Sequence, residues 1–183
     1  IPSKDIVVNG AIYTPNYIRE YINNSSVAKL NITHETKVAD IACGSGAFLY
    51  TVSKYIKNTT TYSLFDIYKN NIFGLDIQNY SIVRTEILLT LHAIINGEDR
   101  KKFKFNLFKG DALEFDWNQV SVIQNNNGLD SVVGNPPYVG SSNLDEQTKK
   151  LMKNWSVSST GKLDLYIPFF QIGLRWLNDN GIL

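Results

Sequence analysis

The chain has 183 residues, of which 43% are hydrophobic and 19% are charged, and its formal net charge is +1. Intrinsic disorder is excluded, because it requires lower hydrophobicity and a larger net charge. A disulfide scaffold is excluded as well, because Cys43 is the single cysteine. A chain of this length can bury a sizeable core without disulfides or metal.

No stretch of the sequence suggests a membrane span or an export signal. The longest apolar run, at 166–177, is interrupted by proline, glutamine, glycine and arginine, and it is shorter than the roughly 18 apolar residues of a membrane span. Nothing near the first residue resembles a signal peptide. The near-neutral charge also argues against strong polyanion binding by this chain alone. We expect one cytoplasmic domain, or a large part of one.

Patterns of strand length and of helical spacing alternate along the chain. The strand-length apolar runs lie at 37–43, 71–76, 103–109 and 129–134. Helical spacing covers 15–30, 47–57, 78–96 and 163–178. This alternation is typical of a parallel sheet with helices on both faces. The expected fold is therefore α/β and Rossmann-like.

The helical segment at 78–96 carries a broad apolar stripe, which we expect to pack in the core. The stripe consists of Ile82, Ile87, Leu88, Leu91 and Ile95. By contrast, the stretch 140–162 is polar and weakly patterned, so it is predicted to be a long mobile loop.

Both ends of the sequence look like cuts. The chain starts at Ile1 without a methionine, and it stops shortly after the turn-like segment Asn178-Asp179-Asn180-Gly181. We therefore expect the sheet to be truncated before its last strands.

A glycine-rich turn follows the first strand run and leads directly into a helical segment. It reads Asp40-Ile41-Ala42-Cys43-Gly44-Ser45-Gly46-Ala47-Phe48. Glycines at such a turn let the backbone and the helix N–H groups approach a ligand. The turn indicates a nucleotide-type cofactor site, although a plain connection would also fit it. It is not a full dinucleotide fingerprint, because Leu49 stands where a third glycine is expected.

Carboxylates end three of the four strand runs. Asp40, Asp76 and Asp111 stand at carboxyl ends, which parallel strands bring to one edge of the sheet. Carboxylates gathered on one edge repel one another unless a ligand or a donor separates them. Asp76 is placed to accept hydrogen bonds from the two hydroxyls of a ribose.

The fourth strand run ends in a rigid segment, Asn135-Pro136-Pro137-Tyr138. Consecutive prolines fix the backbone and remove two amide donors, so the Asn135 amide and the Pro136 carbonyl are held as free acceptors. Such acceptors suit a planar NH2 group. The ring of Tyr138 offers a face on which the ring bearing that amine could stack.

Taken together, these motifs resemble the adenine-N6 DNA methyltransferases of restriction-modification systems, which use S-adenosylmethionine. Tyr13-Thr14-Pro15 after Gly10 is similar to the family's N-terminal cofactor motif, and Asp164-Leu165-Tyr166 followed by Phe169 matches another family segment. The likeness covers nearly the whole chain. Its order of motifs is the one in which a target-recognition domain follows at the C-terminus.

The resemblance implies that all 183 residues form part of one catalytic domain. Residues 1–36 would hold the N-terminal motif and a helix, 37–139 the core sheet, 140–162 the loop, and 163–183 a helix and the start of the next strand. The implied contacts of S-adenosylmethionine are Tyr13, Thr14, Asp40, Ala42, Cys43, Gly44, Gly46, Phe48, Asp76, Ile77, Asp111, Ala112, Asn135 and Phe169.

The implied reaction is direct methyl transfer to the N6 of a flipped adenine in double-stranded DNA. Asn135 and Pro136 would accept the two amine hydrogens and stabilise the charge that develops on nitrogen, and Tyr138 would stack on the base. Pro137 is a further candidate substrate contact. Lys149 and Lys150 are candidate DNA contacts because they lie in the loop just past Tyr138, although a solvated loop surface would also explain them. No metal is implied, and a fused or partner endonuclease is compatible with the resemblance.

Residues outside these motifs have plainer interpretations. The Cys43 thiol is expected to pack as a small residue within the turn. His34 and His92 are expected to be structural or exposed, and the charge run at 100–104 to be a solvated face.

Alternatives to a DNA methyltransferase stay open. Release-factor glutamine methyltransferases carry the same Asn-Pro-Pro-Tyr segment and methylate an amide nitrogen, although Tyr13-Thr14-Pro15 and the Cys-Gly-Ser-Gly turn look like the DNA enzymes. Adenine in RNA and the exocyclic nitrogen of cytosine are lesser possibilities. A nonenzymatic alternative is a remnant that holds cofactor or DNA without catalysing a reaction. The presence of all expected site residues argues against such a loss of activity.

Overall fold

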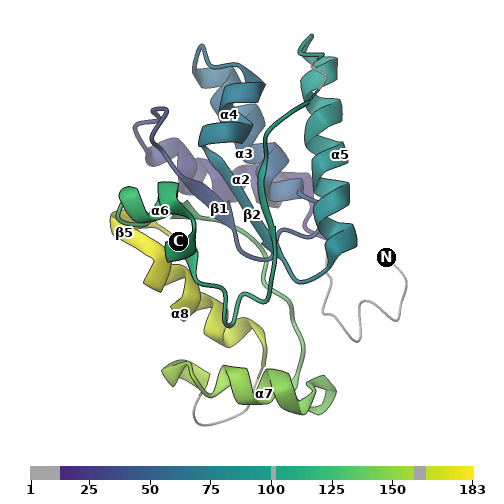
Figure 1. Cartoon of the computed structure of the whole chain (residues 1–183), viewed down its shortest axis with the longest axis vertical. Helices are drawn as coiled ribbons and strands as arrows, with labels where there is room; N and C mark the ends of the chain where they lie inside the picture. Colours follow the sequence, from purple (N-terminus) through teal and green to yellow (C-terminus); the bar gives the residue numbers. More distant parts are fainter. Residues whose placement is uncertain (1–12, 100–101, 159–163) are drawn as a thin grey trace.

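The computed structural model describes residues 13–99, 102–158 and 164–183. Its centre is a parallel five-stranded sheet in the order β3-β2-β1-β4-β5; β1, β2 and β5 are labelled in Figure 1. The strands are β1 (Val38–Asp40), β2 (Ile72–Asp76), β3 (Asn106–Lys109), β4 (Leu129–Val132) and β5 (Leu177–Ile182). The predicted α/β fold with a parallel sheet is confirmed.

Helices cover both faces of the sheet. One face carries α2 (Asn16–Ser25), α3 (Ala47–Thr59), α4 (Leu64–Asn70) and α5 (Asn79–Ile95). The other carries α6 (Ser121–Asn125), α7 (Glu146–Met152) and α8 (Tyr166–Trp176). Short 3-10 turns lie at Val27–Lys29, Trp117–Gln119, Ser141–Asn143 and Ser156–Ser158. None of the helices in the described ranges is long and apolar enough to cross a membrane.

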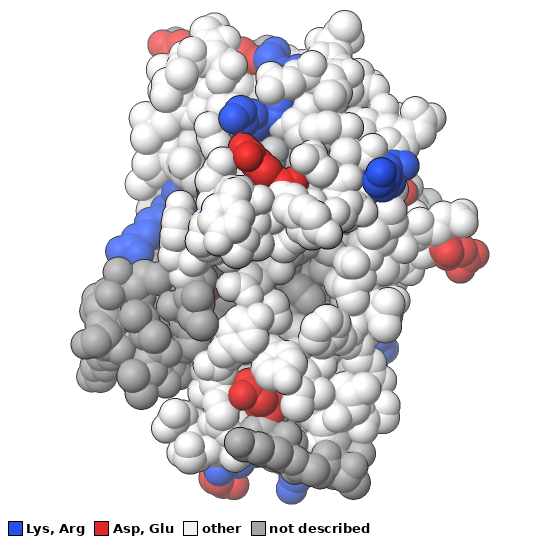
Figure 2. Space-filling model, turned by 180° about the vertical axis from the view of Figure 1, so that it is seen from behind, with Lys and Arg blue, Asp and Glu red and all other residues white. Residues whose placement is uncertain are grey.

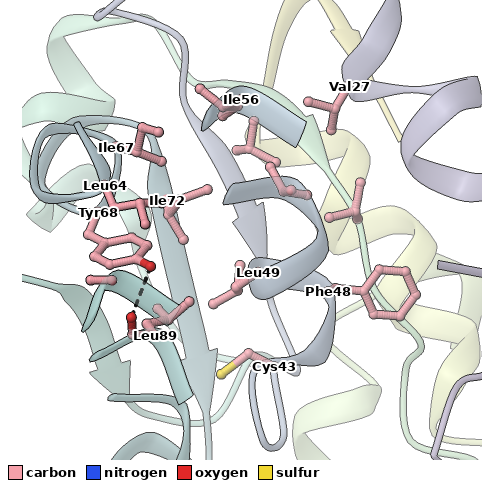
Figure 3. Close-up of a cluster of buried hydrophobic side chains, with 14 of the residues drawn as sticks. Val27, Cys43, Phe48, Leu49, Ile56, Leu64, Ile67, Tyr68, Ile72 and Leu89 are labelled. Carbon is pink, nitrogen blue, oxygen red and sulfur yellow. Dashed lines mark hydrogen bonds between the residues drawn. The ribbon is translucent and has the colours of Figure 1, made fainter. Parts of the chain in front are cut away.

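The alternation of side chains along each strand builds two separate cores. On β1, Val38 points into the cluster under α3 and α4, while the next residue, Ala39, belongs to the cluster under α6 and α8. Ile72 and Phe73 divide in the same way on β2. Both faces of a parallel sheet are buried, which explains why its strands read as continuous apolar runs. Figure 3 shows the first cluster, in which the Tyr68 hydroxyl donates to the Leu89 carbonyl, 2.9 Å away.

The predicted first helix, at 15–30, ends earlier than its pattern suggests. Helix α2 stops at Ser25, and Ser26 leaves helical geometry while its hydroxyl donates to the Ile22 carbonyl, 2.7 Å away. A serine that bonds to the backbone in this way competes with continuation of the helix. The short helices α4 and α6 were not predicted. Helix α4 begins at Leu64, and the side chain of the preceding Ser63 caps it by accepting from the Asp66 N–H.

The prediction of an unstructured loop at 140–162 is wrong for the segment that contains α7. Asp145 caps this helix at the Thr148 N–H, 2.7 Å away. Met152 is fully buried in the second core, and the Trp155 indole donates to the Leu113 carbonyl, 3.0 Å away. The segment is held in place by single apolar residues, Met152 and Trp155, with polar residues around them. A search for continuous apolar periodicity does not detect such isolated contacts. Residues 159–162 of the expected loop lie outside the described residues.

The expected turn at 178–181 is part of a strand. Strand β5 pairs with β4 through an irregular register, the Asn178 amide donates to Asp130 at 2.8 Å, and the Ser131 hydroxyl donates to the Ile182 carbonyl at 2.9 Å. Partners on β4 thus outweigh the turn preference of Asn, Asp and Gly.

The expected burial of the whole apolar stripe predicted at 78–96 is also wrong. Ile82 is buried and Leu88 is half-buried, but Ile87, Leu91 and Ile95 are exposed. The core-facing side of α5 instead carries Ile82, Leu89 and Ala93.

Candidate functional site

Two adjoining cavities open at the carboxyl edge of the sheet. The first has a volume of about 290 Å³ and is bordered by the glycine turn, the end of β2 and the residues after β3. The second has a volume of about 580 Å³ and lies between α2, the end of β4 and α8. Side chains lining both cavities include Thr14, Asp40, Phe48, Asn135 and Phe169.

The glycine turn is shaped by close contact with α5. Gly44 and Gly46 have φ values of +53° and +83°, which favour glycine. A Cβ at Gly46 would lie 2.7 Å from Cγ2 of Thr85, and the Thr85 hydroxyl donates to the Gly44 carbonyl at 3.1 Å. The turn therefore presents its backbone to the first cavity in a fixed position.

Asp76 links this turn to the start of α5. Its Oδ2 accepts from the Gly44 N–H at 2.9 Å, and its Oδ1 accepts from the Gln78 N–H at 2.8 Å. Burial raises the pKa of Asp76, and these two backbone donors, together with a hydrogen bond from the Ser81 side chain, oppose that shift. Each carboxylate oxygen can accept a second hydrogen bond, so Asp76 retains capacity for a ligand in the cavity that it lines.

Asp40 is a deeply buried carboxyl between the two cavities. It is 2% exposed, and its Oδ1 accepts from the Ala42 N–H at 3.0 Å. Burial, together with the nearby charge of Asp76, raises its pKa to about 7. A Cβ at Gly134 would lie 2.6 Å from Oδ1, so glycine is needed for β4 to end this close to the carboxyl. A positively charged ligand beside Asp40 would stabilise its ionised form.

The third strand end borders the first cavity from the other side. Asp111 Oδ1 accepts from the Leu113 N–H at 2.9 Å, and burial raises its pKa. Ala112 is buried and Ile77 is exposed, and both line the cavity. The three carboxylates predicted to share one sheet edge are therefore all found at the first cavity.

Asn135 is oriented by a residue from the N-terminal motif. Its Nδ2 donates to the Thr14 hydroxyl at 3.1 Å. The buried Arg19 fixes Thr14 in turn, because one guanidinium nitrogen donates to the Thr14 carbonyl and another donates to the Thr51 hydroxyl at 3.2 Å. No described residue donates to Asn135 Oδ1 or to the Pro136 carbonyl. Within the described residues, two rigid acceptors are thus left without a donor, one on Asn135, which lines both cavities, and one on Pro136, which lines the second.

An aromatic row lies beside these acceptors. The rings of Tyr138 and Tyr166 are 5.4 Å apart, and Tyr166 meets Phe170 edge-on at 6.3 Å. Tyr138 and Phe170 line the second cavity and are exposed. The open face of Tyr138 is therefore accessible to a planar ligand.

The lysines predicted to contact the substrate lie outside both cavity linings. Lys149 and Lys150 are in the last turn of α7, where Lys149 forms a 2.8 Å ion pair with Glu146. Thr148 from the same helix does line the first cavity.

Sequence reasoning missed several lining residues. In the first cavity these include Gln78, Tyr80, Ser81, Arg84, Thr148 and Leu165, and in the second Ile18, Ile22, Phe170 and Leu183. The signal for Tyr80 and Arg84 is available in the sequence, because a helix that starts just after Asp76 points its first turns at the same edge. No comparable signal marks Thr148.

Burial makes Cys43 a packing residue of the turn. The burial and the charges of Asp40 and Asp76 all raise the pKa of the Cys43 thiol, which keeps it protonated. This agrees with its expected role as a small packed side chain.

The fold matches that of class I S-adenosylmethionine-dependent methyltransferase structures. A structure described as a putative enzyme of this class from Listeria monocytogenes aligns with a TM-score of 0.63 at 16% identity, covering 94% of this chain and 46% of that one. The DNA-bound restriction-modification enzyme MmeI aligns with a TM-score of 0.70 at 16% identity, covering 99% of this chain and 31% of MmeI. At these identities the likeness concerns the fold alone.

The chain belongs to the Eco57I restriction-modification methylase family, whose model matches residues 70–183. The type II restriction enzyme and methyltransferase RM.BcgI of Heyndrickxia coagulans is 30% identical over 145 residues, covering 78% of this chain and 20% of that protein. RM.Eco57I of Escherichia coli is 24% identical, covering 100% of this chain and 23% of that protein. The chain thus spans about a fifth of the length of these relatives.

Proposed function

We propose that this chain is the catalytic part of an S-adenosylmethionine-dependent adenine-N6 DNA methyltransferase of a restriction-modification system. The observation that carries the proposal is the pair of free acceptors at Asn135 and Pro136, held in place through Thr14. Family membership supports the restriction-modification context. A relative named as a restriction enzyme and methyltransferase supports DNA as substrate.

The first cavity suits S-adenosylmethionine by the chemistry of its donors and acceptors. Asp76 would accept from the ribose hydroxyls with its remaining lone pairs, while Asp111, Ala112, Ile77 and Phe169 would enclose the adenine. The glycine turn at 42–46 and Asp40 would border the methionine part, together with Tyr13, Thr14 and Phe48. When bound, the cofactor supplies an electrophilic methyl group on a positive sulfonium, which a buried carboxyl such as Asp40 favours.

The protein's contribution to the reaction would be alignment and charge stabilisation. Asn135 Oδ1 and the Pro136 carbonyl would each accept one hydrogen of the exocyclic amine, which directs the nitrogen lone pair toward the methyl group. The same acceptors would stabilise the positive charge that grows on nitrogen. Tyr138 would hold the flipped base by stacking, which is worth about 1–3 kcal/mol per base, and Pro137 would shape the adjoining wall.

Most of the DNA affinity would come from the rest of the polypeptide. Figure 2 shows the molecule from behind the view of Figure 1, and on this face Lys and Arg are scattered rather than gathered in one patch. The formal net charge is only +1. Phosphate binding requires clustered positive charge. Lys149 and Lys150 would add a local contact near the cavities. Double-stranded DNA would then be bound by the full-length protein in the cytoplasm, alongside a fused or partner endonuclease.

Methyl transfer by the full-length protein tests this proposal. Tritium-labelled S-adenosylmethionine would be offered with DNA, RNA or a release factor, and the modified nucleoside or residue would be identified after digestion. The proposal predicts label on N6-methyladenine in DNA. Label only on a release-factor glutamine, or only on RNA, would contradict it, and cofactor binding without transfer to any of the three would favour a noncatalytic module.

A further inference from the structure

Helix α5 exposes an apolar stripe along its full length. Tyr80, Val83, Ile87, Leu91 and Ile94 are each 44–54% exposed, and the adjacent Ile95 is 83% exposed. We call these six residues the α5 stripe. Figure 1 shows α5 at one side of the molecule. Contiguous exposed apolar side chains of this kind mark interaction surfaces.

The α5 stripe is distinct from the side of α5 that packs on the sheet. Ile82, Leu89 and Ala93 are buried in the first core, and at 3.6 residues per turn they lie on the opposite side of the helix from Val83, Ile87 and Leu91. The helix is therefore apolar on both sides. A helix with this property is normally enclosed by protein on both sides.

We propose that the α5 stripe is the docking surface for an amphipathic helix of the same polypeptide that lies outside these 183 residues. The steps of three and four from Tyr80 through Val83, Ile87 and Leu91 to Ile94 form a continuous ridge, and such a ridge packs into the groove of another helix. An apolar ridge of this kind is normally buried, and no described residue covers it.

Relatives in the family are long enough to contain such a helix. Two family relatives are about four times as long as this chain, because 78% of the chain matches 20% of RM.BcgI and the whole chain matches 23% of RM.Eco57I. A tethered segment also competes at an effective concentration in the millimolar range. A separate subunit or a second copy must instead overcome the entropy of association.

The stripe reaches the first cavity at one end. Tyr80 belongs to the stripe and also lines that cavity, where the Arg84 guanidinium lies 5.0 Å from its ring centre. A helix docked along α5 would therefore end beside the cavity wall. The docked segment would therefore lie next to the first cavity without contacting the reacting atoms.

Photo-crosslinking in the full-length protein tests the proposal. A benzophenone amino acid replaces Leu91, and after irradiation the linked peptides are identified by mass spectrometry. The matched control carries the same group at Lys54, which is exposed on α3. The proposal predicts a product of monomer mass that links position 91 to a helical peptide outside residues 1–183, and no such link from position 54. Links between two copies, links to another protein, or no protein link at all would overturn it.

A second variant addresses the same surface by stability. Leu91→Asp in the full-length protein would place a charge in the docked interface and is expected to lower the melting temperature by about 3 °C or more. Lys54→Asp is expected to shift it by less than about 1 °C, as for other surface substitutions. Equal shifts for the two variants would contradict docking on the stripe.

Discussion

The Asn135 amide donates to the Thr14 hydroxyl across 3.1 Å, although the two residues are 121 positions apart in the sequence. Because this bond uses Nδ2, the Oδ1 of Asn135 is left to accept from a ligand. Arg19 holds Thr14 through its backbone carbonyl. The N-terminal motif and the Asn-Pro-Pro-Tyr segment therefore act as one unit, in which Thr14 orients Asn135.

Replacing Thr14 by valine removes this acceptor while keeping the shape of the side chain. We expect the rate of methyl transfer by the full-length protein to fall about fivefold, since a net hydrogen bond contributes about 1 kcal/mol. Thr14→Ser keeps the hydroxyl and is the control. Single-turnover rates measured at saturating cofactor make the comparison, and equal rates for all three proteins would show that Thr14 does not orient Asn135.

Asp76→Ala is expected to weaken cofactor binding by roughly 1.5–3 kcal/mol, because hydrogen bonds to a charged group are lost. The Gly44 and Gln78 N–H groups also lose their acceptor in this variant, so the turn itself loosens. Asp76→Asn retains one carbonyl oxygen and is expected to lie between Asp76→Ala and the unmodified protein. Isothermal titration calorimetry with S-adenosylmethionine measures the dissociation constants, and an unchanged value for Asp76→Ala would refute the ribose assignment.

Cofactor binding is expected to release protons near neutral pH. Burial raises the pKa of Asp40 to about 7 in the folded chain, so part of the population carries a neutral carboxyl there. A positive sulfonium favours the ionised form and lowers that pKa. Affinity should therefore weaken as the pH falls from 8 to 6. Calorimetry in two buffers of different ionisation enthalpy counts the protons, and Asp40→Asn should abolish the release.

Stability should depend on pH through His92. Burial, with a further contribution from Lys54, lowers the pKa of His92 below 6.5 in the folded state. Its Nδ1 lies 3.0 Å from the Tyr68 hydroxyl and 3.3 Å from the Ser53 hydroxyl. Both hydroxyls already donate to backbone carbonyls, so the neutral ring carries its proton on Nδ1.

The unfolded chain binds a proton at His92 more readily than the folded chain does. Its contribution to stability is therefore complete above about pH 6.5 and is lost as the pH falls through the lowered pKa. Asp40 acts in the opposite direction, since its raised pKa stabilises the fold at low pH and that contribution fades as the pH rises toward 7. The contribution of His92 to stability is isolated by measuring urea midpoints between pH 5 and 7.5 for the unmodified protein and for His92→Gln. Parallel curves would contradict it.

Local patterns predicted much of the fold and the first cavity. Strand periodicity and the carboxyl-end positions of Asp40, Asp76 and Asp111 follow from sequence alone, because parallel strands place their ends on one edge. The glycine turn before α3 was likewise readable from Gly44 and Gly46.

Long-range contacts account for what the sequence did not predict. The bond between Thr14 and Asn135, the anchoring of α7 through Trp155 and the pairing of Asn178 with Asp130 each join distant segments. The predicted burial of the apolar stripe at 78–96 was wrong for a different reason. Its periodicity predicts burial correctly only if a partner is present, and the described residues contain none for Ile87 and Leu91.

The most direct test of the central claim is the rate of tritium transfer to DNA by the full-length protein carrying Asn135→Ala, with the cofactor dissociation constant measured on the same sample. We predict that transfer is abolished while the dissociation constant stays within about tenfold, because the variant removes an acceptor of the reacting amine while the other implied cofactor contacts stay in place. Methyl transfer at the unmodified rate in this variant would contradict the account.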